Sequence, residues 1–150
     1  ICACLVGSEM CIRDRGITVP IIGGDGWDSP KLVEIAGASS LNNTYFTNHY
    51  SPDSTNEASK AFVDTYAKTY KQKPDAPAVL GYDGAMLLAD SIKRAGVYES
   101  AKVAEALAAT KDFQAVTGKT SLDASHDAVK SAVIVGFKDG KQVYRATVNP

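Results

Sequence analysis

The feature that most constrains the fold is a β-branched run that ends in glycines and is followed at once by a helix signature. The run at 17–22 reads Ile-Thr-Val-Pro-Ile-Ile, and Gly-Gly-Asp-Gly at 23–26 closes it. Such a run predicts a buried strand that ends in a tight loop. Asp28 or Ser29 can then cap a helix whose first residue is Pro30. Strand, glycine loop and helix together indicate an α/β unit.

The rest of the chain continues this alternation. Ser54 and Glu57 stand three residues apart as a capping box, and Asp139-Gly140 between two apolar runs predicts a β-hairpin. The segment at 116–119 is turn-like and leads into a polar stretch. We expect an α/β fold with a mostly parallel sheet, in which ligands bind beyond the carboxyl ends of the strands. The expected elements are a strand at 45–50, helices at 55–72, 76–95 and about 100–110, and strands at 132–137 and 143–148.

Composition excludes several classes of protein. The chain has 150 residues, 45% of them hydrophobic and 22% charged, which suits a globular domain with an apolar core. A net charge of -1, with Lys and Arg scattered along the chain, offers no basic surface for a phosphate backbone. Nucleic-acid binding is therefore disfavoured. No apolar run reaches the roughly 20 residues that a membrane-spanning helix needs.

The cysteines are confined to the start of the chain, at Cys2, Cys4 and Cys11. Residues 4–15 resemble the translation of a short-read sequencing adapter, so we interpret residues 1–15 as a non-native artefact and exclude them from the fold. Two alternatives are weaker. A thiolate metal site would need about four ligands, and a signal peptide that ends at a lipid-modified cysteine would begin with a basic segment.

The glycine loop is also the segment best suited to bind a small molecule. Glycines let the backbone approach a ligand closely, while Asp25 adds a charge and Trp27 a large flat apolar face. The alternative is a tight turn in which Asp25 forms the turn and Trp27 belongs to the core. The pattern Gly-x-Gly-x-x-Gly is absent, so the loop is not predicted to hold phosphate.

Four segments in the same order resemble the C-terminal part of the Leu/Ile/Val-binding family of type I periplasmic binding proteins. They are the segments at 20–32, 45–53, 80–90 and 106–113, and the resemblance covers 16–150. It implies an α/β fold in which two Rossmann-like lobes, joined by hinge crossovers, close on a ligand. Residues 16–49 would end the second lobe, 50–130 would end the first, and the hairpin at 131–150 would return to the second. The implied hinge residues are His49, Tyr50 and Ser51.

The same resemblance implies a ligand site and a role in transport. Asp25 matches the acidic position that holds the α-ammonium group of an amino acid, and Gly26 and Trp27 would lie beside that ligand. Asp25 stands where similar leucine binders carry Glu. The implied protein binds a branched-chain or similar amino acid between its lobes and delivers it to an ABC permease in the inner membrane. It would be periplasmic or otherwise extracytoplasmic, and would need no cofactor or metal. Alternatives within this fold are an amide- or urea-binding protein, or another ligand-sensing receptor domain.

An enzyme is the rival class. It would need a base and a nucleophile within hydrogen-bond reach, and the available side chains are Asp25, Ser29, His49 and His126. No catalytic motif such as Gly-x-Ser-x-Gly or His-Glu-x-x-His is present, so catalysis is not expected. His126 is expected to be solvated. For Tyr82 and Asp83 we favour structural roles, Tyr82 in packing and Asp83 as a partner of a loop or hinge.

Overall fold

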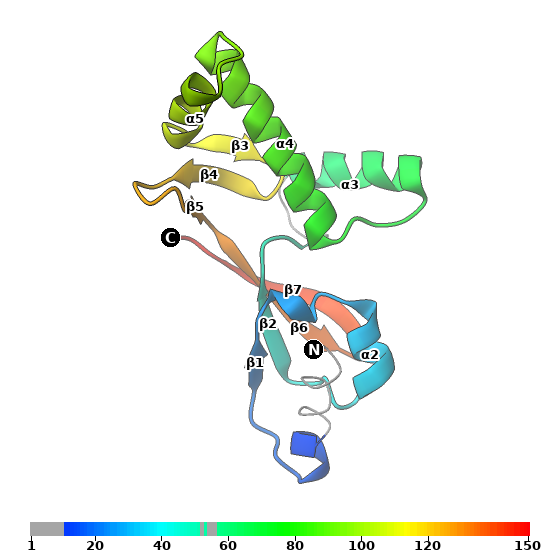
Figure 1. The fold of residues 1–150 in the computed structure, drawn as a ribbon. Helices are drawn as coiled ribbons and strands as arrows, with labels where there is room; N and C mark the ends of the chain where they lie inside the picture. The colour runs from blue at the N-terminus through cyan, green and yellow to red at the C-terminus, as the bar shows by residue number, and fades with distance from the viewer. Residues whose placement is uncertain (1–10, 52, 54–56) are drawn as a thin grey trace. The chain divides into compact units, whose positions relative to one another are not determined.

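The computed structural model describes residues 11–51, 53 and 57–150, and the chain divides into two compact units (Figure 1). Unit 1 comprises residues 1–53 and 132–148, and unit 2 comprises residues 54–131 and 149–150. The chain therefore passes from unit 1 to unit 2 after Asp53 and returns after Ser131. The assignment of these units to the second and first lobes of a binding protein stays a prediction.

Unit 1 is built on a four-stranded sheet of order β1-β2-β6-β7, formed by Ile21–Gly23, Thr44–Asn48, Ala132–Lys138 and Lys141–Val148. β1 and β2 are parallel, whereas β6 is antiparallel to both of its neighbours. The expectation of a mostly parallel sheet is therefore wrong for the described strands, because the terminal hairpin places β6 beside β2. The hairpin is confirmed. Asp139 and Gly140 have φ values of 52° and 74°, as a two-residue type I′ turn requires.

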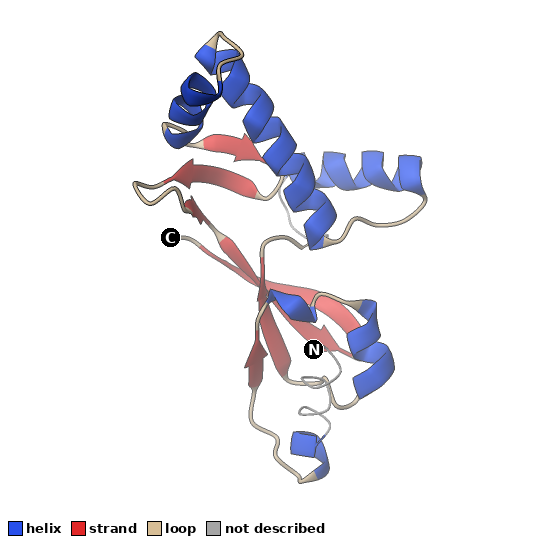
Figure 2. Ribbon diagram, viewed as in Figure 1, coloured by secondary structure: helices blue, strands red, loops and turns tan. Residues whose placement is uncertain are grey.

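The core of unit 1 lies between this sheet and two short helical elements, η1 (Asp25–Trp27) and α2 (Pro30–Ala36) (Figure 2). The Oγ atom of Ser29 accepts a hydrogen bond of 3.3 Å from the backbone N–H of Lys31, so Ser29 rather than Asp28 caps α2. The rings of Phe46 and Phe137 stack with their centroids 5.6 Å apart. The buried core residues are Trp27, Leu32, Ala36, Leu41, Phe46, Val133, Val135 and Phe137.

Arg13 attaches the start of the described chain to unit 1. It lies in a helical turn at 11–14, and its guanidinium donates hydrogen bonds to backbone carbonyls in two loops. Ile12 is only half-buried and is not part of the core. Leu5 and Val6 lie outside the described residues, so the non-native origin of residues 1–15 stays a prediction. The carbonyls that Arg13 contacts belong to Ile17, Val19, Ser40, Asn42 and Asn43.

In the described part of the chain, unit 2 combines three helices with a three-stranded antiparallel sheet. The predicted helix at 55–72 is observed as α3, whose described residues run from Glu57 to Tyr70, and the proposed cap Ser54 lies outside the described residues. The sheet was not expected, because 116–122 read as a turn and a polar stretch. The other elements are α4 (Ala76–Ala95), α5 (Ser100–Ala108), β3 (Phe113–Ala115), β4 (Gly118–Leu122) and β5 (Ala128–Lys130).

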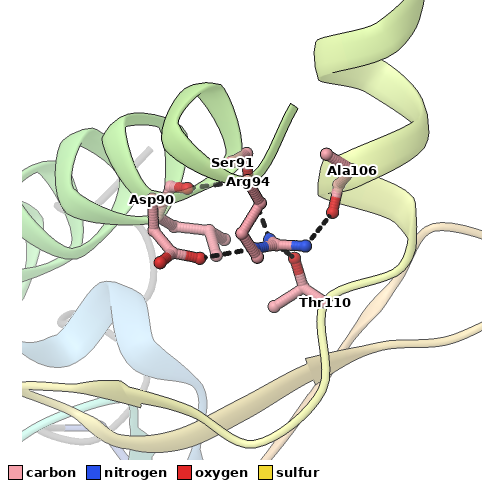
Figure 3. Close-up of polar contacts among 6 residues, drawn as sticks. Asp90, Ser91, Arg94, Ala106 and Thr110 are labelled. Atoms are coloured by element: carbon pink, nitrogen blue, oxygen red, sulfur yellow. Dashed lines mark hydrogen bonds and ion pairs between the residues drawn. The ribbon is translucent and has the colours of Figure 1, made fainter. Parts of the chain in front are cut away.

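Helix α4 has the predicted bounds, and both of its ends carry a local signal. Asp75 accepts a hydrogen bond of 3.0 Å from the N–H of Ala78, and Gly96 ends the helix in the left-handed conformation. Near its C-terminal end, Arg94 connects α4 to α5 (Figure 3). Its guanidinium donates to the carbonyl of Ala106 and, at 2.8 Å, to Oγ1 of Thr110. Among the described helices, none is long and apolar enough to cross a membrane.

Candidate functional site

The loop that follows β1 is held in place by the packing of Trp27. A Cβ atom added to Gly23 would lie 2.5 Å from the Trp27 ring, closer than any real contact, so only glycine lets the ring pack over the end of β1. The space around Gly24 and Gly26 is open. Backbone hydrogen bonds from Trp27 to Gly24 and from Asp28 to Asp25 close the turn. The loop therefore has a defined conformation.

Trp27 is a core residue of unit 1. It is 7% exposed and belongs to the buried cluster of that unit. This burial supports the packing alternative for Trp27. Its predicted place beside a ligand, and that of Gly26, stay predictions.

Asp25 differs from Trp27 because its carboxylate faces outward. Its side chain is 64% exposed, and Oδ2 lies 3.3 Å from Nε2 of His49. The His49 side chain is 44% exposed, so this contact is open to water. The structure thus brings together the predicted ligand anchor and a predicted hinge residue. A carboxylate in such a position can accept hydrogen bonds from an ammonium group that approaches from solution.

The parallel pairing of β1 with β2 explains this contact. Gly23 pairs with Phe46, so the two strands end at the same edge of the sheet. Asp25 is two residues beyond Gly23, and His49 is three residues beyond Phe46. Both side chains therefore lie just past the carboxyl ends of their strands, which is where open α/β sheets place their ligands.

Asp28 connects the same loop to two strands of the sheet. Its Oδ2 accepts a hydrogen bond of 3.0 Å from Nδ2 of Asn48, and its Oδ1 accepts one of 3.0 Å from Nε2 of Gln142. The Oδ1 atom of Asn48 in turn accepts a hydrogen bond of 2.8 Å from the backbone N–H of His49. Sequence reasoning missed these roles of Asn48 and Gln142, because no local pattern marks contacts across 20 and 114 positions.

The other two predicted hinge residues are buried. Tyr50 and Ser51 are each 3% exposed, and Oγ of Ser51 accepts a hydrogen bond of 3.4 Å from the N–H of Asp53. The Tyr50 hydroxyl has no hydrogen-bond partner among the described residues. Burial raises the pKa of Tyr50 to about 12, with smaller contributions from the charges of Asp53 and Asp28. Both residues come directly before the passage to unit 2 after Asp53. A hinge at 49–51 stays a prediction.

In unit 2, Asp83 acts as predicted and bonds a loop. Its Oδ1 accepts a hydrogen bond of 2.7 Å from the N–H of Val116, and its Oδ2 accepts one of 3.0 Å from the N–H of Thr117. Tyr82 packs against Phe62, with ring centroids 4.8 Å apart, which confirms its packing role.

Unit 2 also has an apolar groove of 740 Å³ between α3, α4 and β3. Its lining is mostly apolar, and Asp83 is the charged residue in it. The groove therefore offers an apolar surface more than a recognition site for an amino acid. Its aromatic and other large apolar lining residues are Phe62, Tyr66, Tyr70, Tyr82, Met86 and Phe113.

The side chains considered for catalysis have separate structural roles. Ser29 caps α2, whereas Asp25 pairs with His49. His126 lies in unit 2, in a turn where its N–H donates to the carbonyl of Asp123. Within the described ranges, no three His, Cys, Asp or Glu side chains are placed to hold a metal ion. Cys2 and Cys4 of the alternative thiolate site lie outside those ranges, and Cys11 is exposed.

Comparison with known proteins identifies the family. A sequence model of the family described as periplasmic binding protein matches residues 11–142, a span that includes the last five residues of the segment interpreted as non-native. The chain is 29% identical over 137 residues to the Leu/Ile/Val-binding protein homolog 2 of Brucella abortus (strain 2308), covering 89% of this chain and 36% of that protein. It is 30% identical over 116 residues to homolog 1 of Brucella suis, covering 77% of this chain and 30% of that protein.

Comparison with solved structures points to the same family. The leucine-binding protein LivK of Thermotoga maritima superposes with a TM-score of 0.86 at 37% identity, over 97% of this chain and 41% of its own. The branched-chain amino acid transporter substrate-binding protein LivJ of Streptococcus pneumoniae, in complex with isoleucine, gives a TM-score of 0.83 at 36% identity, over 99% of this chain and 42% of its own.

These matches define a solute-binding protein of mixed α/β fold. The chain belongs to the periplasmic binding protein family and has the type I fold of its branched-chain amino acid members. The proteins that it matches are solute-binding proteins and not enzymes. The chain spans about two fifths or less of the length of those relatives, between 30% and 42%.

Proposed function

We propose that this chain is part of the extracytoplasmic solute-binding component of an ABC importer, which binds a branched-chain or similar amino acid and delivers it to a permease in the inner membrane. The likeness to LivK and LivJ supports this proposal, and so does the family to which the chain belongs. The observation that carries it is the exposed carboxylate of Asp25 beyond the carboxyl end of β1. We assign Asp25 as the anchor of the ligand's α-ammonium group.

The chemistry of a free amino acid explains why a carboxylate is needed. The ligand presents a cation and an anion together, so a receptor requires a negative group for the first and hydrogen-bond donors for the second. Asp25 supplies the negative group. Gly26 has open space around it, so its backbone can approach the same ligand.

The test uses the full-length protein that carries this chain. If the complete cleft is largely dry, Asp25→Asn leaves a buried ammonium unpaired, which costs about 3 to 5 kcal/mol. Leucine affinity should then fall by roughly a hundredfold to several thousandfold in isothermal titration. An N-acetylated amino acid should fail even with the native protein. Simple amides, which lack the ammonium, should be much less sensitive to the substitution.

Asp139→Asn is the matched control, because it makes the same change at an exposed turn position of unit 1. Asn-Gly and Asp-Gly both favour the type I′ turn, so this variant should fold and bind normally. A thermal melt checks the folding of each variant. Leucine affinity within a few fold of native in a folded Asp25→Asn protein would show that Asp25 is only a turn residue.

A further inference from the structure

His49 has a second role beside the predicted hinge, because its side chain faces the candidate anchor. Its Nε2 lies 3.3 Å from Oδ2 of Asp25. A neutral imidazole leaves the negative charge of that oxygen uncompensated, whereas an imidazolium ion adds a positive charge beside it. The charge state of His49 therefore decides whether Asp25 meets a ligand as a free anion or as one half of an ion pair.

The backbone of His49 is held by a hydrogen bond and does not depend on the contact with Asp25 alone. Its backbone N–H donates to Oδ1 of Asn48, which is 3% exposed. The amide of Asn48 donates to Asp28, and Gln142 on β7 donates to the same carboxylate. The end of β2 is thereby joined to the loop that carries Asp25. This network holds the backbone of His49 beside the loop that carries the anchor.

We propose that His49 is a positioning residue for Asp25 and makes the affinity for the amino acid depend on pH. The inference rests on the proposed function, since it assumes that Asp25 holds the ammonium group. Neutral His49 leaves the negative charge of the carboxylate available to the ligand. Protonated His49 occupies the carboxylate and repels the ligand's ammonium. Acidification therefore weakens binding and favours release.

Three further titratable groups belong to this end of β2, since Tyr50 follows His49 in the chain, Asp28 is bonded to Asn48, and the charge of Asp53 acts on Tyr50. Asp28 is bonded by Asn48 and Gln142, and the charges of Asp28 and Asp53 both act on Tyr50. Carboxylates and tyrosines ordinarily keep one charge state between about pH 5.5 and pH 8, whereas histidine changes its charge in that range. A contribution of His49 to the affinity should therefore appear within this interval, and comparison with the His49→Gln variant isolates it.

The experiment measures leucine affinity of the full-length protein by calorimetry at about pH 5.5, 6.5 and 8, across the range in which histidine titrates. An exposed pair of this kind is worth up to about 1 kcal/mol, so native affinity should fall about two- to fivefold at the acidic end. His49→Gln, which keeps a neutral N–H donor, should have a flat profile. His126→Asn is the control, because it removes the chain's other histidine at a left-handed position that Asn tolerates. It should keep the native profile.

A His49→Gln protein with the native pH profile would overturn the inference. This result differs from the one that would refute the proposed function. The proposed function fails if the Asp25→Asn protein binds leucine with native affinity. A ligand-free measurement tests the contact itself. In NMR spectra at about pH 8, where histidine is mostly neutral, Asp25→Asn should shift the ring signals of His49 and leave those of His126 in place. Unchanged His49 signals would show that the contact is absent.

Discussion

Asp83 offers the sharpest test of the fold of unit 2. It is 8% exposed on α4, and its two carboxylate oxygens accept hydrogen bonds from consecutive backbone N–H groups, those of Val116 and Thr117. The substitution Asp83→Asn keeps the shape of the side chain but replaces one acceptor oxygen with an NH₂ donor. One backbone N–H therefore faces another donor in a buried place.

The size of the effect follows from these contacts. A hydrogen bond to a charged group contributes about 1.5 to 3 kcal/mol, and an unsatisfied buried donor costs about 1 to 3 kcal/mol. Asn retains one of the two bonds, so we expect Asp83→Asn to lower the free energy of unfolding by about 2 to 4 kcal/mol. The segment at 116–117 should be the first to loosen.

The assay is denaturant unfolding of the chain, combined with amide hydrogen exchange at Val116 and Thr117. Asp90→Asn is the matched control on the same helix. Asp90 is 39% exposed and pairs with Arg94 at 2.7 Å, so its loss should cost at most about 1 kcal/mol. Equal destabilisation by the two substitutions, or unchanged exchange at Val116 and Thr117, would refute the role assigned to Asp83.

Two further predictions concern other sites. The pKa of Tyr50 is raised to about 12, chiefly by burial. A raised pKa in the folded state means that the stabilising contribution of Tyr50 is complete below about pH 10 and is lost as pH rises toward 12. Thermal melts across that window should therefore show a smaller fall in melting temperature for Tyr50→Phe than for the native chain. Equal falls in melting temperature would contradict the assignment. Around the groove of unit 2, Tyr70 is 62% exposed, Tyr82 45% and Met86 46%, so the chain should self-associate at high concentration. Sedimentation velocity should show less association for Tyr70→Lys, and an unaltered profile would exclude this face as the contact.

Elements with signals inside their own sequence could be predicted closely. The bounds of helix α4 were predicted correctly from Pro77 in its first turn and from Gly96, which ends the helix in the left-handed conformation. The terminal hairpin has Asp139-Gly140 at its turn, which sets the register of the two strands as far as the pair Val135 and Tyr144, where a shift of one residue follows. In both cases the decisive residues lie within the element itself.

Elements that depend on distant partners could not be predicted. Strands β3 and β5 have three residues each, and β4 reads Gly-Lys-Thr-Ser-Leu, without the alternation of a half-buried strand. These segments become strands only because β4 pairs with β3 on one side and with β5 on the other. The contact between Asp25 and His49 is of the same kind. It needs the parallel pairing of β1 with β2, which neither strand indicates alone.

The two interpretations of the glycine loop, structural turn and ligand site, apply to different residues of the same loop. Gly23 and Trp27 serve packing, because the indole occupies the space that a Cβ at 23 would fill. That packing fixes the backbone on both sides of Asp25, whose side chain is 64% exposed. A fixed loop has little conformational entropy to lose when a ligand binds, and an ordered residue would otherwise cost about 1 to 2 kcal/mol. Burial of Trp27 is therefore part of the reason why an exposed Asp25 can serve as an anchor.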